Sequence, residues 1–220
     1  MSSNYTLSIY AGPSLHDESR ALIASRPDWH LLPPVRRGDL PALPAAQRQE
    51  GSTIVIADGL FHQELAVGHI EIRKLLEAGV QVWGVSSMGL LRAYEMRDLG
   101  MQGFGRIYRR CFEMEDFQDD EVALLHEPGP GYKAVTEPMI HYRHCLETLV
   151  ERGKLEQAAA AAITGELKNR WYGERKLSLF RKLLATHSGQ EAASLVPDFV
   201  PYRIKQQDLF DLLRYLSDHA

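Results

Sequence analysis

The sequence has few cysteines and no long hydrophobic run, and each shortage excludes a class of protein. With only Cys111 and Cys145 in 220 residues, neither a disulfide framework nor a cysteine-rich zinc module can form, which fits a reducing compartment. No apolar stretch approaches the roughly 20 residues that span a bilayer, and residues 1–4 lack the charged and apolar regions of a secretory signal. We therefore expect a cytoplasmic protein that does not bind membranes.

Excess positive charge and nucleotide-binding motifs are also missing. Lys and Arg total 25 against 29 Asp and Glu, a formal net charge of −4, so a nucleic-acid partner is not expected. Neither G-x-G-x-x-G nor G-x-x-x-x-G-K-[ST] occurs, which disfavours an enzyme that binds NAD or ATP, and we expect no cofactor. The remaining composition, 45% hydrophobic and 25% charged, is that of an ordinary globular chain.

Strand and helix patterns alternate along the first hundred residues. Alternating or continuous apolar runs predict strands, and apolar residues at helical spacing that end at glycine predict helices. This alternation predicts an α/β fold, a Rossmann-like parallel sheet flanked by helices. The expected strands are 5–11, 29–32, 52–57 and 80–85, and the expected helices follow Ser14 or span 64–78 and 88–99.

The pattern becomes helical in the last eighty residues. We expect a core domain over residues 1–137 and a helical C-terminal extension over 138–220 that packs on it. Between the two, residues 104–111 have the pattern of an edge strand. The predicted helices of the extension are 139–151, 154–171, 174–185 and 206–217, and the residues expected in an exposed docking patch on it are Phe180, Leu183, Leu184, Phe199 and Phe210.

Polar residues that follow the predicted strands are the candidate site, because open parallel sheets bind ligands at the carboxyl ends of their strands. The segment Gly84-Val85-Ser86-Ser87-Met88-Gly89 places two hydroxyls at a helix N-terminus, where backbone N–H groups attract anions or stabilise an oxyanion. Its spacing differs from the nucleophile motif G-x-S-x-G. A pair of serines that only caps a buried helix is the alternative interpretation.

Two histidines, His62 and His69, precede the serines and allow three roles. One of them can act as the base for Ser86 or Ser87, oriented by Asp58. Zinc ligation is the second role, although the i, i+4 spacing of H-E-x-x-H is absent. Hydrogen bonding without catalysis is the third.

Other charged residues and one thiol offer further chemistry. The arginines Arg36, Arg37 and Arg92 can orient a carboxylate, thiocarboxylate or phosphate, or can simply be solvated. The acidic segment 113–121 can bind Mg²⁺ but lacks EF-hand spacing, so a solvated loop is the alternative. Cys111 is a conceivable sulfur carrier or a buried thiol.

Five ordered segments together resemble one family. The segments are Ile9 to Leu15, Pro33 to Leu40, Asp58 to Gln63 together with His69 to Ile72, Gly84 to Glu95, and Gly100-Met101 extending through 119–123 to His126. In order and spacing they are similar to the core of TfuA-like proteins, over roughly residues 5 to 140. The sequence departs from the family pattern at Tyr94, where a smaller residue is usual, and at 66–68, where a bulkier residue commonly precedes the histidine.

The resemblance implies a protein that works beside an ATP-dependent YcaO enzyme in backbone thioamidation of ribosomally made peptides. The implied partners are a YcaO-family enzyme, a ubiquitin-like sulfur-carrier protein and, indirectly, the peptide substrate. On this reading the chain hydrolyses the carrier's C-terminal thiocarboxylate and supplies sulfide. A non-catalytic adaptor that recruits or stimulates YcaO is the alternative, and a small-molecule hydrolase unrelated to sulfur ranks last.

The residues that we assign to this reading fall into two groups. The catalytic candidates are Ser86, Ser87, His62, His69 and Asp58. The candidates for substrate binding are Arg36, Arg37, Arg92, Ser14 and Glu95. Water activated by a histidine, without an acyl-serine intermediate, is an equal alternative for the chemical step, and no metal site is predicted.

Overall fold

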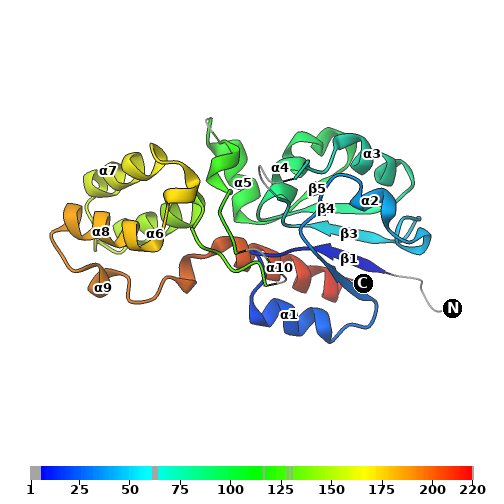
Figure 1. Cartoon of the computed structure of the whole chain (residues 1–220), viewed down its shortest axis with the longest axis horizontal. Helices are drawn as coiled ribbons and strands as arrows, with labels where there is room; N and C mark the ends of the chain where they lie inside the picture. Colours follow the sequence, from blue (N-terminus) through cyan, green and yellow to red (C-terminus); the bar gives the residue numbers. More distant parts are fainter. Residues whose placement is uncertain (1–5, 61–63, 116, 128, 130, 220) are drawn as a thin grey trace. The chain divides into compact units, whose positions relative to one another are not determined.

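A computed structural model describes residues 6–60, 64–115, 117–127, 129 and 131–219, and the contacts divide the chain into two compact units (Figure 1). The first unit comprises residues 1–117 and 205–220, and the second comprises 118–204. The proposed boundary of folding domains at residue 137 stays a prediction. Among the described residues, no helix is long and apolar enough to cross a membrane.

The first unit is built on a parallel sheet of five strands, as the alternating pattern predicts. The order across the sheet is β2-β1-β3-β4-β5, and each neighbouring pair is parallel. The strands are β1 (Leu7–Tyr10), β2 (Trp29–Leu32), β3 (Thr53–Ile56), β4 (Gln81–Gly84) and the short β5 (Gln102–Gly103). All four residues of β3 are buried, because this central strand is covered on both faces.

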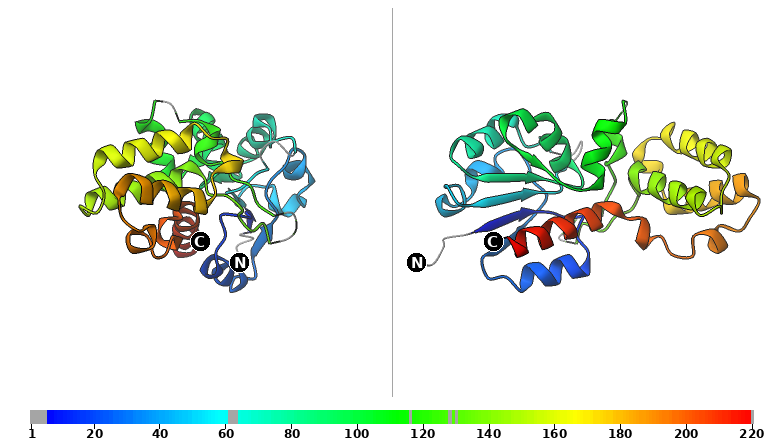
Figure 2. Two further views of the ribbon diagram at one scale, coloured as in Figure 1. Left: turned by 60° about the vertical axis from the view of Figure 1, so that its left-hand side comes forward. Right: turned by 180° about the vertical axis from the view of Figure 1, so that it is seen from behind.

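Helices cover both faces of this sheet, and the side chains of its strands alternate between two cores. Val55 of β3 contributes to one core and Ile54 and Ile56 to the other, as a strand period of two requires. One face carries α1 (Asp17–Ala24) and α10 (Ile204–Asp218), and the other carries α2 (Asp39–Ala42), α3 (His69–Glu77) and α4 (Met88–Glu95) (Figures 1 and 2). The 3₁₀ helices η1 (Ala45–Gln47) and η2 (Arg97–Leu99) complete the connections.

One prediction for the first unit is wrong: residues 104–111 do not form an edge strand. They fall mainly in helix α5 (Arg106–Glu113), and β5 ends before them. The side chain of Asp208, on α10, accepts a hydrogen bond from the backbone N–H of Ile107 at 2.9 Å. It thus provides an acceptor for one of the N–H groups in the first turn of α5, which have no partner within the helix. Gly105 supplies the left-handed backbone (φ +99°) that this close approach needs. The helix therefore depends on a partner about a hundred residues away.

The second unit is helical, as predicted. It contains the helices α6 (Met139–Glu151), α7 (Gln157–Lys168), α8 (Leu177–Ser188) and α9 (Ala192–Leu195), with the 3₁₀ helices η3 (Asp119–Glu121), η4 (Tyr172–Glu174) and η5 (Val200–Tyr202). Four residues expected in an exposed docking patch are instead buried in its core: Phe180, Leu183, Leu184 and Phe199. The expectation of a patch built from them is wrong, because the second unit needs their apolar area to form a core of its own.

Candidate active site

The loops after β1 and β3 are joined by one buried carboxylate at the point where the strand order reverses. In open parallel sheets, ligands bind outside the carboxyl ends of the strands at such a reversal. Asp58, which follows β3, accepts hydrogen bonds at Oδ2 from the backbone N–H groups of Gly12 (2.8 Å) and Ser14 (2.9 Å). Its Oδ1 accepts one from the Ser14 hydroxyl at 2.8 Å. The structure thus brings Asp58 and Ser14 together at this edge of the sheet.

The turn after β4 places two serines beside this carboxylate in a strained backbone. Ser86 has φ +65°, a left-handed conformation that residues with a Cβ rarely adopt. The N–H of Ser87 donates to the carbonyl of Val85 at 2.7 Å and closes a tight γ-turn around Ser86. Ser87 occupies the N-cap position of α4, yet its side chain makes no capping hydrogen bond. Helix capping therefore does not account for these two hydroxyls.

Two glycines let α4 begin against the sheet. A Cβ built on Gly89 would lie 1.7 Å from the carbonyl oxygen of Ile56, and one built on Gly84 would lie 2.0 Å from the carbonyl oxygen of Gly89. Both contacts are far inside van der Waals separation, so only glycine fits at either position. The spacing G-x-S-S-x-G is thus a packing requirement that brings the serine turn against the end of β3.

A lysine from the far end of the chain completes the cluster. Lys205, in the first turn of α10, is 2% exposed. Its Nζ lies 3.0 Å from Ser87 Oγ and 3.9 Å from Asp58 Oδ1. Its backbone carbonyl accepts a hydrogen bond from Ser86 Oγ at 2.6 Å. A hydroxyl, an amine and a carboxylate therefore meet in the interior, at the carboxyl ends of β1, β3 and β4.

The sequence analysis missed Lys205, although the spacing of apolar residues that follow it indicates that it is buried. Lys205 precedes Leu209 and Leu212 by four and seven residues, so it lies on the apolar face of an amphipathic helix. Asp208 lies near the same face and is 1% exposed. A charged residue on a helix face that is otherwise buried must find a partner.

A pocket of about 770 Å³ lies beside the first two turns of α10. Its walls combine aromatic side chains with both signs of charge. They include Phe104, Arg106, Arg109, Gln207, Asp208 and Phe210. Gln207 and Asp208 follow Lys205 within one turn, but Lys205, Asp58 and the two serines do not line this pocket.

The predicted pairing of His69 with the serines is not what the structure shows. The Nε2 atom of His69, at the start of α3, lies 2.7 Å from Oε2 of Glu95, the last residue of α4. The same oxygen accepts a hydrogen bond from Arg92 Nη1 at 2.6 Å. At 1.5 Å of rise per residue, Glu95 lies about 10 Å along α4 from its start at the serine turn. His69, Glu95 and Arg92 form a separate surface cluster, and His62 lies outside the described residues.

Arg36 and Arg37 are exposed on the loop after β2. Arg36 pairs with Asp39, with its Nε 3.6 Å from the carboxylate Oδ2, and the backbone N–H of Arg37 donates to the carbonyl of Leu65. Both guanidinium groups therefore belong to the outer surface of the first unit, and their role in substrate binding stays a prediction.

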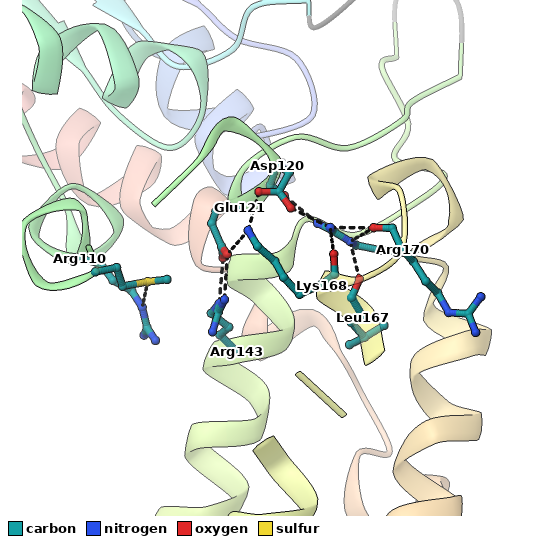
Figure 3. A network of polar contacts seen from close by, with 9 residues as sticks. Arg110, Asp120, Glu121, Arg143, Leu167, Lys168 and Arg170 are labelled. Atoms are coloured by element: carbon teal, nitrogen blue, oxygen red, sulfur yellow. Dashed lines mark hydrogen bonds and ion pairs between the residues drawn. The ribbon is translucent and has the colours of Figure 1, made fainter. Parts of the chain in front are cut away.

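The acidic segment 113–121 supplies ion pairs within the second unit. Glu121 is fully buried and accepts two hydrogen bonds from Arg143, both at 2.9 Å. Asp120 pairs with Lys168 at 2.6 Å and with Arg175 at 2.8 Å (Figure 3). Cations thus neutralise both carboxylates. Across the described ranges, no cluster of three or more His, Cys, Asp or Glu residues could hold a metal ion.

The thiol of Cys111 is unsuited to carrying sulfur. Burial raises the pKa of Cys111 to about 12, so the thiolate that attacks sulfur donors is scarce at neutral pH. The thiol faces the carbonyl of Ile107 within its own helix. Cys111 is therefore a small apolar residue of the core.

Comparison with known families identifies the chain. A model of the TfuA-like protein family matches residues 58–176, which is more than half of the sequence. The chain belongs to the TfuA-like protein family. Members of this family are associated with enzymes of the YcaO type. No curated protein matches the sequence.

The matched range refines the resemblance seen in the sequence. It begins at Asp58 and contains both serines, His69, Arg92 and Glu95. The segments around Gly12 and Arg36 lie before it, whereas much of the helical region after residue 140 lies inside it. Lys205 lies beyond its end, so membership of the TfuA-like family says nothing of this residue.

Proposed function

We propose that this TfuA-like protein supplies sulfide to a YcaO enzyme for backbone thioamidation of a peptide, by hydrolysing the C-terminal thiocarboxylate of a ubiquitin-like sulfur carrier. One observation carries the proposal. On a strained turn between a strand and a helix, the Ser87 hydroxyl contacts the buried amine of Lys205, and the Ser86 hydroxyl donates to the backbone carbonyl of the same lysine. This cluster lies beside Asp58, at the reversal point of the sheet. Backbone strain of this kind concentrates at functional sites.

The chemistry requires one nucleophile and one departing sulfide. The Ser87 oxygen attacks the thiocarboxylate carbon, an ester forms between Ser87 and the carrier's terminal glycine, and the C–S bond breaks. The serine proton leaves with the sulfur as HS⁻. Water then hydrolyses the ester to a carboxylate and restores the hydroxyl.

The pocket beside α10 is the space that we propose for the carrier's extended tail. Its aromatic walls suit a flexible glycine-rich backbone, and Arg109 provides positive charge for an anionic terminus, whereas Arg106 already pairs with Asp208. The surface cluster of His69, Glu95 and Arg92, together with Arg36 and Arg37, is then left for contacts with the folded part of the carrier.

A second candidate, the non-catalytic adaptor, is favoured by the burial of the serines. Ser86 is 0% and Ser87 2% exposed, so a substrate must enter an interior site. On this alternative the cluster only holds the strand ends together, and the chain recruits or stimulates the YcaO enzyme through its surface.

The test measures sulfide release and thioamidation on the same samples. Thiocarboxylated carrier is incubated with the wild type, with Ser87→Ala and with Ser178→Ala, an exposed serine of α8. We expect release by the wild type and by Ser178→Ala, and loss of at least 100-fold in Ser87→Ala. YcaO-dependent thioamidation that is stimulated equally by the wild type and Ser87→Ala, without any release of sulfide, would reject the hydrolase and establish the adaptor.

A further inference from the structure

We propose that the free edge of β2, the side of Trp29–Leu32 that faces away from β1, binds an extended and uncharged segment of the peptide substrate as an added strand. The inference rests on the proposed function for the identity of the peptide, but not for the site. β2 pairs with β1 along one side, and no strand among the described residues lies along its other side. An open strand edge is a template for pairing with another chain.

The backbone groups of β2 alternate between the sheet and the free edge. The carbonyls of Asp28 and Leu32 accept hydrogen bonds from β1 and the residue after it, both at 3.1 Å. Every second residue of a parallel strand bonds to the same neighbour, so Trp29 and Leu31 face the free edge. The N–H of Trp29 donates to the carbonyl of Arg26. Within the described part of the chain, the N–H and C=O of Leu31 and the C=O of Trp29 are therefore left for a partner.

A groove of about 600 Å³ runs beside this edge. All four residues of β2 line it, and Leu31 is 38% exposed. Its further walls include Ala42, Leu43 and Pro44, from the end of α2 to the start of η1. The side chains of an extended peptide alternate between two faces, so every second one can enter this apolar groove. Backbone bonds to the free edge would supply affinity, and the groove a preference for apolar side chains.

The charges of the groove favour an uncharged, internal segment of a peptide over a charged chain terminus. Arg36 and Asp39 both line the groove and pair with each other, with 3.6 Å between Nε and Oδ2. The one guanidinium among the described residues of the lining is thus already engaged by a carboxylate. An anionic end, such as the thiocarboxylate of the carrier, gains little attraction here and needs a cation elsewhere.

The free edge fits a peptide better than it fits a second copy of this chain. In a twofold antiparallel pairing about Leu31, the two copies of this residue would exchange their N–H and C=O bonds. The carbonyl of Trp29 would then face Pro33 of the other copy, which has no N–H to donate. A peptide without proline can instead donate to the carbonyls of both Trp29 and Leu31 and accept from the N–H of Leu31. It uses all three backbone groups.

The first experiment tests strand pairing with a defined probe. A capped hexapeptide of alternating threonine and valine, which is uncharged and readily extended, is titrated into the isotope-labelled full chain. NMR follows the backbone amide signals and detects weak binding. A second hexapeptide has the same side chains but is N-methylated at every amide, so it cannot donate. We compare the wild type with Leu31→Pro, which removes the N–H of an edge residue, and with the matched control Leu31→Val, which keeps it. Circular dichroism and thermal unfolding verify that both variants are folded.

We expect the first hexapeptide to shift the amide signals of β2 in the wild type and in Leu31→Val, and to bind Leu31→Pro about 10-fold or more weakly. The methylated hexapeptide should shift none of them. Strand pairing is overturned if no signal of β2 shifts in the wild type, if folded Leu31→Pro and Leu31→Val bind equally, or if both peptides bind alike. The two peptides on the wild type decide the matter even if Leu31→Pro does not fold.

The second experiment identifies the segment and separates this inference from the proposed function. YcaO-dependent thioamidation is measured against the concentration of the peptide substrate, and sulfide release from the carrier is measured on the same samples. Leu31→Pro should raise the KM for the peptide about 10-fold or more relative to Leu31→Val, with sulfide release unchanged. Equal KM values beside normal sulfide release would keep the proposed function and reject the peptide site. A raised KM in Leu31→Pro, with no sulfide release even by the wild type, would keep the peptide site and reject the hydrolase.

Discussion

Both units of this protein bury charged side chains, but they use them differently. In the second unit, Asp120 and Glu121 are surrounded by Arg143, Lys168 and Arg175, and Arg175 also donates to backbone carbonyls that follow or end α7 (Figure 3). Each charge there meets an opposite charge at short distance. Such a network fixes chain segments to one another and leaves little for a ligand to bind.

In the first unit, the buried amine of Lys205 lies closer to the hydroxyl of Ser87 than to the carboxylate of Asp58. Its distance to Ser87 Oγ is 3.0 Å, whereas Asp58 Oδ1 is 3.9 Å away. The turn that carries the serine has a strained backbone, which nothing in the second unit's ion-pair network requires. The comparison teaches that burial of charge alone does not mark a site. A buried charge beside a nucleophilic atom on a strained backbone does.

Removing a cation from the second unit should have the largest effect on stability. Arg175→Met removes one of the two cations that pair with Asp120 and leaves several backbone carbonyls without their donor, and it should lower the free energy of unfolding by about 3–5 kcal/mol. Denaturant unfolding measures the loss. The control Arg181→Met, an exposed residue of α8, should stay within about 0.5 kcal/mol of the wild type. Equal stability of the two variants would show that the network is not structural.

Adding one methyl group should distinguish the glycines of the two units. Gly89→Ala pushes α4 away from the carbonyl of Ile56 and should lower the free energy of unfolding by about 1–3 kcal/mol. It should also slow the phosphonylation of Ser87 by an alkyl fluorophosphonate, because the serine turn moves with α4. Gly165→Ala, in α7, meets nothing within 4 Å and should stabilise the protein by about 0.5–1 kcal/mol. Chemical denaturation tests both, and a neutral Gly89→Ala would contradict the close packing of α4.

The two units should respond oppositely to acid. Burial raises the pKa of Asp208 despite its bonds to Ile107 and Arg106, so its contribution to stability falls as pH rises from 3.8 through its raised value. Burial also acts to raise the pKa of Glu137, but hydrogen bonds and charges from His141 and Arg203 outweigh it and lower that pKa. The stability that Glu137 contributes is present above 4.5 and is lost as pH falls through its lowered value.

The free energy of unfolding, measured as a function of pH, tests the opposite pH dependences expected for Asp208 and Glu137. Asp208→Asn should remove the fall in stability above pH 3.8, and Glu137→Gln should reduce the loss below pH 4.5. Identical pH profiles for the wild type and both variants would show that neither carboxyl is coupled to folding.

The smallest effect is expected at the surface cluster. Oε2 of Glu95 meets both His69 and Arg92, but the side chains of His69 and Glu95 are largely exposed, so solvent screens their attraction. His69→Gln should change the free energy of unfolding by less than about 1 kcal/mol in denaturant. A loss comparable to that of Arg175→Met would mean that this cluster is structural.

The sheet could be predicted from the sequence because its signals are local. The continuous apolar run 52–57 and the glycine-terminated helices specify strands and helices without any knowledge of their partners. The apolar spacing of Leu209 and Leu212 likewise predicts α10, and the structure confirms it. The pattern at 104–111 gave a wrong prediction of a strand. The N-terminus of α5 is stabilised by a hydrogen bond from the Ile107 N–H to Asp208, which is distant in sequence, so no local pattern contains this contact.

The candidate site could be predicted only in part, because some of its contacts join residues that are distant in the sequence. Asp58, Ser86 and Ser87 follow predicted strands, so topology alone places them at one edge of the sheet. Lys205 reaches that edge from a helix that returns to the first unit after the whole second unit. His69 was an expected partner of the serines by residue type, and the direction of α4 separates it from them.

The most direct test of the central claim is the mass of the chain after a single turnover. The wild type is mixed with thiocarboxylated carrier, quenched in acid within the first turnover, and analysed by intact and peptide mass spectrometry, with Ser87→Ala beside it. The account predicts an ester that joins the carrier's terminal glycine to Ser87, formed together with one equivalent of sulfide and absent from Ser87→Ala. Sulfide release by Ser87→Ala at the wild-type rate, with no carrier bound to either protein, would contradict it.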